Sequence, residues 1–163
     1  MEKKKKIVRL TTAGESLDDL LIGQLKYLNQ YFDIIAVAKE NKFPITNLHL
    51  QKFMYFTLKL AKEENIIDEK ILREMYDEPF EIWTYGPVVR YQYLRFKRFA
   101  SEYILGSFEQ NSILKPLNPI ILELFQVDIF TLVDISTRLP FWVQHKDKIK
   151  NGISEIEYSF DDI

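Results

Sequence analysis

The chain contains no convincing constellation of residues that would bind a metal ion or attack a substrate. Its only histidines are His49 and His145, and it has no cysteine. A metal site needs further ligands at a regular spacing, and neither histidine belongs to an HxxE or ExxH pattern. The sequence also lacks a G-x-S-x-G elbow and a G-x-x-x-x-G-K phosphate loop. We therefore expect no catalytic residue, no metal and no cofactor, and predict that the protein is not an enzyme.

Carboxylates gather at two places, 77–81 and 161–162, where acidic side chains are most simply interpreted as a solvated surface. An enzymatic alternative would require buried carboxylates with perturbed pKa values that line one cleft.

Cations and aromatic rings alternate along the chain from Arg90 to Phe99. Cations can bind phosphates and rings can stack on bases, so a nucleic-acid-associated regulator is the alternative function. It would use a helix over 87–103 and the cations Arg90, Arg95, Lys97 and Arg98. A core helix whose cations reach solvent explains the same pattern, and we favour it because the net charge is -2.

The most distinctive run is Trp83-Thr84-Tyr85-Gly86-Pro87-Val88-Val89. Gly86 tolerates backbone angles that other residues avoid, and Pro87 lacks an amide N–H and has a fixed φ. We predict a tight turn here, with Pro87 as the first residue of a helix. If exposed, this aromatic corner would suit the anchoring of a protein partner. If buried, it would serve to position the following helix.

The elements around this corner are mainly helical. Apolar spacing, capping residues and prolines predict, in chain order, helix 26–41, helix 46–65, helix 68–76, strand 80–84, helix 87–103, a loop over 101–117 with a short strand near 104–108, helix 119–127, helix 128–138 and a helical turn opening at Ser159. Helix 87–103 is apolar on nearly all faces, so we expect it to be buried on most of them. In helix 46–65, Lys52, Lys59 and Lys62 lie outside the apolar stripe.

Composition places these elements in one globular unit. The chain has 163 residues, of which 47% are apolar. We predict a flexible basic arm over 1–23 and, over 24–163, a mainly α single domain with a small β-hairpin or short strand before the Gly-Pro-Val turn. No apolar run approaches the roughly 20 residues that span a bilayer. We expect a cytoplasmic protein with no membrane partner, because the absence of cysteine also fits a reducing compartment.

Three elements in order resemble the Panacea domain, a SocA-like antitoxin family that includes phage-associated proteins. Leu50-Gln51-Lys52-Phe53-Met54-Tyr55-Phe56 is similar to its L-Q-K-hydrophobic-hydrophobic-Y helix. Trp83-x-Tyr85-Gly86-Pro87-Val88 is similar to its aromatic residue followed by Y/N-G-P-V. The stretch 132–142 is similar to its Leu-x-x-x-(S/T)-His motif followed by Pro and Trp, with Arg138 where histidine is expected. The resemblance covers about Tyr31 to the C-terminus.

This resemblance implies an antitoxin that neutralises a partner toxin by direct protein–protein binding. The toxin would be encoded by an adjacent gene, and the antitoxin would in some cases act as an adaptor that delivers it to a cytosolic ATP-dependent protease. A role that needs the missing histidine would not carry over to Arg138. The candidate partner-binding residues are Tyr55, Trp83, Tyr85, Gly86, Pro87, Arg90, Arg138 and Trp142.

Overall fold

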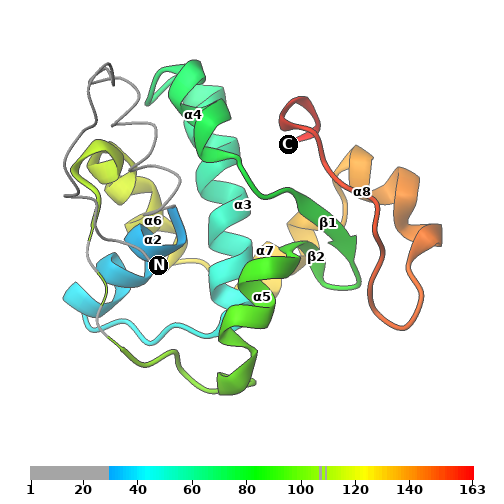
Figure 1. The fold of residues 1–163 in the computed structure, drawn as a ribbon, viewed down its shortest axis with the longest axis horizontal. Helices are drawn as coiled ribbons and strands as arrows, with labels where there is room; N and C mark the ends of the chain where they lie inside the picture. Colours follow the sequence, from blue (N-terminus) through cyan, green and yellow to red (C-terminus); the bar gives the residue numbers. More distant parts are fainter. Residues whose placement is uncertain (1–29, 107, 109) are drawn as a thin grey trace, which may run out of the picture.

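The computed structural model describes residues 30–163 except 107 and 109, and for 30–32 it describes only the backbone. The predicted basic arm over 1–23 and the start of helix 26–41 lie outside the described residues. The described part is mainly α-helical and contains one two-stranded antiparallel hairpin, as the sequence predicts. In Figure 1, α3 runs through the middle, with α2 and α6 on one side and the hairpin on the other.

The helices before the hairpin lie within the predicted ranges. They are α2 Gln30–Glu40, α3 Asn47–Glu64 and α4 Glu69–Met75. Thr46 caps α3, since its side chain accepts a hydrogen bond from His49 N while the His49 side chain accepts one from Thr46 N. Asn65 ends α3 in the left-handed conformation, and Asp68 caps α4.

The Gly-Pro-Val segment is a strand, so the predicted helix start at Pro87 is wrong. Strands β1 Phe80–Trp83 and β2 Gly86–Val89 pair antiparallel, with Ile82 opposite Pro87. Two physical features favour the strand. The β-branched pair Val88-Val89 suits a pleated surface, and Pro87 faces the outer edge of β2, where its missing N–H costs no bond to β1.

The predicted long helix 87–103 is correspondingly shorter and more exposed. It consists of α5 Arg90–Phe96 followed by a 3-10 turn, Lys97–Phe99. Only Gln92 and Phe96 of α5 are buried, while Tyr91 and Leu94 are exposed. The expectation that most faces of this helix are buried is therefore wrong, because α5 packs against the fold along one face only.

The remaining elements are short. They are the 3-10 helix Ser112–Leu117, α6 Asn118–Leu124, α7 Ile129–Ser136, α8 Pro140–His145, the 3-10 turn Lys146–Lys148 and the 3-10 turn Phe160–Asp162. Asp128 caps α7, which confirms the predicted break near Val127. The strand predicted near 104–108 is not formed by the described residues of that stretch, and α8 was not predicted.

The core of the described chain surrounds α3. Leu50, Phe53 and Leu58 are fully buried on this helix, and α2, α6, α7 and β2 all pack against it. The segment 154–163 lies along β1 on the side away from β2 and contributes Tyr158, Phe160 and Ile163 to the same core. Among the described residues, no helix is long and apolar enough to cross a membrane.

Candidate partner-binding surface at the hairpin tip

The outer edge of β2 is bonded by side chains of α3, where a third strand would otherwise pair. Gln51 Oε1 accepts a hydrogen bond of 2.9 Å from Val89 N, and Lys52 Nζ donates one of 2.6 Å to Pro87 O. Asn47 holds the Gln51 amide in place, since Gln51 Nε2 donates to its side-chain oxygen at 3.1 Å. Because all three side chains are buried, α3 satisfies backbone groups that would be costly to leave unpaired.

Gly86 allows α7 to approach the same part of the hairpin. Its φ is +109°, and a Cβ placed there would lie 2.3 Å from Ser136 Oγ and 3.1 Å from Lys52 Nζ. Ser136, at the end of α7, is buried and donates its hydroxyl to Val133 O. We call Gln51, Lys52, Gly86, Pro87 and Ser136 the hairpin joint. Its members come from the three stretches that resemble the Panacea domain, 50–56, 83–88 and 132–142.

Lys52 is the ionisable side chain of the joint. It is 0% exposed, although the sequence placed it outside the apolar stripe of its helix. Burial lowers the pKa of its amine to about 7, because the interior disfavours the ammonium form. The amine is enclosed by the fold and bonds the hairpin backbone at Pro87 O.

The depressed pKa of Lys52 predicts a pH-dependent contribution to stability. An unfolded lysine has a pKa of about 10.4, so between pH 7 and 10 the unfolded chain binds the proton that the folded chain has released. The free energy of unfolding of the wild type, relative to Lys52→Met, should therefore rise with pH in this window by up to about 1.4 kcal/mol per pH unit.

Urea denaturation of the two proteins at several pH values tests this prediction. The difference between them removes the contribution of Asp33, whose pKa burial raises to about 7. Parallel stability profiles for the two proteins from pH 7 to 10 would show that Lys52 is not titrating as the structure implies.

The joint supports an exposed hairpin tip. The turn residues Thr84 and Tyr85 connect the strands, and the Tyr85 side chain is 62% exposed. Beside it, Trp83 is fixed in orientation, since its Nε1 donates to Glu81 Oε1 at 2.9 Å and its ring packs edge-on against Tyr93. Arg90 pairs with Glu81 at 2.9 Å and lies over the Trp83 ring.

Helices α7 and α8 complete this end of the molecule. Trp142 Nε1 donates to Trp83 O at 2.9 Å, and Ser136 lies against Gly86. Arg138 stands between Ser136 and Trp142 in the chain, and its side chain is 76% exposed, paired at the surface with Asp134. We call Trp83, Tyr85, Arg138 and Trp142 the tip surface.

Some of the predicted partner-binding residues lie in the interior. Tyr55 is 1% exposed, with its ring against Phe56, Phe80 and Tyr158, so it has no surface to offer a partner. Gly86 and Pro87 are also buried, as members of the joint. Arg90 is partly exposed but is engaged with Glu81.

Gln51, Lys52 and Ser136 were not predicted as site residues. Their signal in the sequence is a polar pair beside an apolar helical stripe and a serine at a helix end, both common on surfaces. The β2 backbone gives Gln51 and Lys52 their partners, and it places Gly86 against Ser136.

The histidines have local structural roles. His49 takes part in the capping box of α3, and burial lowers its pKa. His145 Nδ1 lies 2.9 Å from Phe141 O, one helical turn earlier. Within the part of the chain that the structure describes, no group of three or more histidine and carboxylate side chains is placed to hold a metal ion.

The cations of the alternative nucleic-acid surface do not form one stripe. Helix α5 ends at Phe96, so Lys97 and Arg98 lie on a 3-10 turn, and Arg98 packs over the Phe99 ring. Arg90 faces the hairpin, where it pairs with Glu81, while Arg95, Lys97 and Arg98 are on exposed parts of the segment. Arg90 therefore does not share one helix with Lys97 and Arg98, as the predicted helix 87–103 would require.

Comparison of the chain with known proteins matched no protein-family model, no curated protein and no solved structure. The resemblance to the Panacea domain thus stays a prediction from the three sequence elements.

Proposed function

We propose that this protein is an antitoxin-type binding protein that neutralises a protein toxin, encoded by an adjacent gene, through the tip surface. The observation that carries the proposal is an exposed aromatic residue, Tyr85, on a hairpin whose base is fixed by buried side chains. A large ring held in one place contributes contact area at little entropic cost, which is typical of interface hot spots.

The arrangement of the joint also supports the proposal by giving the three family-like elements one physical purpose. The α3 element bonds the edge of β2, the Gly-Pro-Val element forms that strand, and the α7 element closes on Gly86. Each element would be required to keep the hairpin in position. An antitoxin that recognises its toxin with this hairpin would need all three.

We place this activity in the cytoplasm and propose no chemical step. Neutralisation by blocking would leave the toxin intact in the complex. In the adaptor form, the bound toxin would pass to a cytosolic ATP-dependent protease, so its level would fall on co-expression. Immunoblotting of the toxin in protected cells distinguishes the two forms.

Replacing Tyr85 with alanine should weaken toxin binding by about 30-fold or more, the effect of losing about 2 kcal/mol at a hot spot. Calorimetric titration of the purified product of the adjacent gene measures the change, and protection of co-expressing cells should fall with it. Thermal stability should stay close to that of the wild type, because the ring lies at the surface.

Tyr91→Ala is the matched control. Tyr91 is 64% exposed, similar to Tyr85, but lies on α5 beyond the opposite end of β2. The Tyr91→Ala variant should bind the toxin as tightly as the wild type does. Equal losses in the two variants, or failure of the wild type to bind or protect against any adjacent toxic product, would remove the proposal.

A further inference from the structure

The segment 154–163 is held at the free edge of β1 in the manner of an added strand. Ile82 N donates to Ile156 O at 3.0 Å and Tyr158 N donates to Phe80 O at 2.9 Å, with Glu81 opposite Glu157 between them. This is the pattern by which an extended peptide extends a sheet, with main-chain bonds for affinity and side-chain pockets for selectivity.

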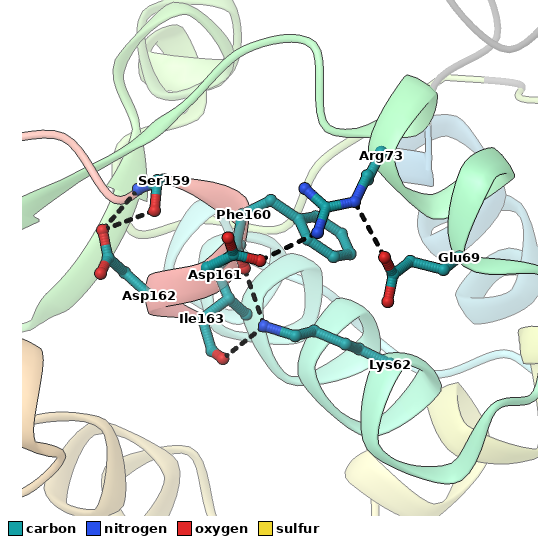
Figure 2. Close-up of polar contacts among 8 residues, drawn as sticks. All are labelled: Lys62, Glu69, Arg73, Ser159, Phe160, Asp161, Asp162 and Ile163. Carbon is teal, nitrogen blue, oxygen red and sulfur yellow. Dashed lines mark hydrogen bonds and ion pairs between the residues drawn. The ribbon is translucent and has the colours of Figure 1, made fainter.

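Side chains of the earlier helices continue these main-chain bonds. The Tyr76 hydroxyl donates to Tyr158 O at 2.6 Å and accepts from Phe80 N at 2.9 Å. Lys62 Nζ donates to both Phe160 O, at 2.8 Å, and Ile163 O, at 3.1 Å (Figure 2). Thus β1, α3 and α4 together provide a groove that binds the backbone of the segment over most of its length.

The groove also selects the segment by charge and by aromatic contact. The Arg73 guanidinium donates to Asp161 Oδ1 at 2.9 Å and lies over the Phe160 ring, 4.4 Å from its centre, as Figure 2 shows. Lys62 lies against the same ring at 4.8 Å. Phe160 and Asp161 therefore contact two cations, Lys62 and Arg73, which α3 and α4 contribute to the groove.

One tight turn joins the segment to the rest of the chain. Lys150 pairs with Ile153 across Asn151 and Gly152, whose φ values are +55° and +89°. None of the groove contacts described above requires the segment to come from the same chain. The same contacts would form with the segment of a second copy if this turn opened.

We propose that the groove formed by β1, α3 and α4 accepts the 154–163 segment of a second copy of this chain, giving a dimer by segment exchange. The groove contacts are the same in both states, so the balance depends on the turn and on effective concentration. A short connection gives the chain's own segment an effective concentration in the millimolar range, so the closed monomer prevails in dilute solution. Deleting Asn151 and Gly152 removes the turn back to the groove and should favour the dimer.

Disulfide trapping in the full-length chain tests the exchange, because the sequence has no cysteine of its own. One protein carries Glu81→Cys in the groove and the other carries Glu157→Cys in the segment. These positions face each other as a non-hydrogen-bonded antiparallel pair, whose Cα atoms are typically about 4.5 Å apart, within disulfide reach. The double variant, which should cross-link within one chain, shows that both substitutions allow folding.

The mixed proteins are concentrated, incubated and then oxidised. The covalent heterodimer should exceed, by at least about tenfold, that formed when Glu155→Cys replaces Glu157→Cys, and its yield should rise with protein concentration. The variant that lacks Asn151 and Gly152 should elute as a dimer in size-exclusion chromatography with light scattering. Heterodimer yields equal to those of the Glu155→Cys mixture, or a folded and monomeric deletion variant, would overturn the proposal.

Discussion

Replacing Gly86 with alanine is expected to lower the free energy of unfolding by about 2 to 6 kcal/mol, one of the largest effects available in this chain. Two costs add. The backbone at Gly86 has a φ of +109°, which strains any residue with a Cβ, and the new methyl would lie 2.3 Å from Ser136 Oγ. Urea denaturation followed by circular dichroism measures the loss.

Gly152→Ala separates strain from overlap. Its φ of +89° also strains an alanine, but the nearest atom, Thr84 Oγ1, would lie at 3.8 Å from the Cβ. It should cost only the strain, about 1 to 3 kcal/mol. Combining Gly86→Ala with Ser136→Ala should recover part of the overlap cost. Equal losses at Gly86 and Gly152, or additive losses in the double variant, would show that the hairpin does not approach α7 as described.

Lys52→Ala should destabilise the protein by about 2 to 5 kcal/mol, similar to truncation of another long buried side chain. The substitution empties a buried volume beside β2 and leaves Pro87 O without the donor that bonds it at 2.6 Å. Lys52→Met keeps most of the volume and should lose only about 1 to 3 kcal/mol, the cost of a buried carbonyl left unpaired.

The surface lysine Lys59 is the control for this pair. It forms an ion pair with Glu63 one turn later on α3, and Lys59→Ala should change stability by less than about 1 kcal/mol. A loss at Lys52→Ala no larger than that at Lys59→Ala would contradict the joint. Loss of Lys52 should also speed hydrogen exchange at the amide of Val89, which lies on the same edge of β2. An exchange rate at this amide that is the same in Lys52→Ala as in the wild type would contradict the joint as well.

Local signals predicted α3 and α4 well. Apolar spacing and the Thr46 cap of α3 are properties of a few neighbouring residues, and the structure places α3 and α4 within the predicted ranges. The same holds for the break before α7, where Asp128 caps the helix. Such elements can be predicted because their stabilising contacts are close in sequence.

The Gly-Pro-Val segment could not be assigned in this way. A proline after a glycine suits both the first turn of a helix and an edge strand. The choice is made by groups distant in sequence: Ile82 across the hairpin, and Gln51 and Lys52 on α3. The burial of Lys52 was missed for the same reason, since its acceptor at Pro87 is 35 positions later in the chain.

The residues of the candidate site were also predicted only in part, because their burial depends on distant parts of the chain. The sequence singled out Trp83, Tyr85 and Trp142, which lie together at the hairpin tip. It did not distinguish them from Tyr55, because an aromatic residue in a motif has the same appearance whether it faces solvent or the core. Burial separates the residues that support the hairpin from those that could contact a partner.

Hydrogen exchange with and without the purified product of the adjacent gene tests most directly whether the tip surface is the binding surface. Binding should slow amide exchange in peptides covering 83–86 and 138–143, while the exposed helix 90–96 stays unchanged. Protection confined to α5 or to any region away from the hairpin tip, in a complex that forms and neutralises the toxin, would contradict the central claim.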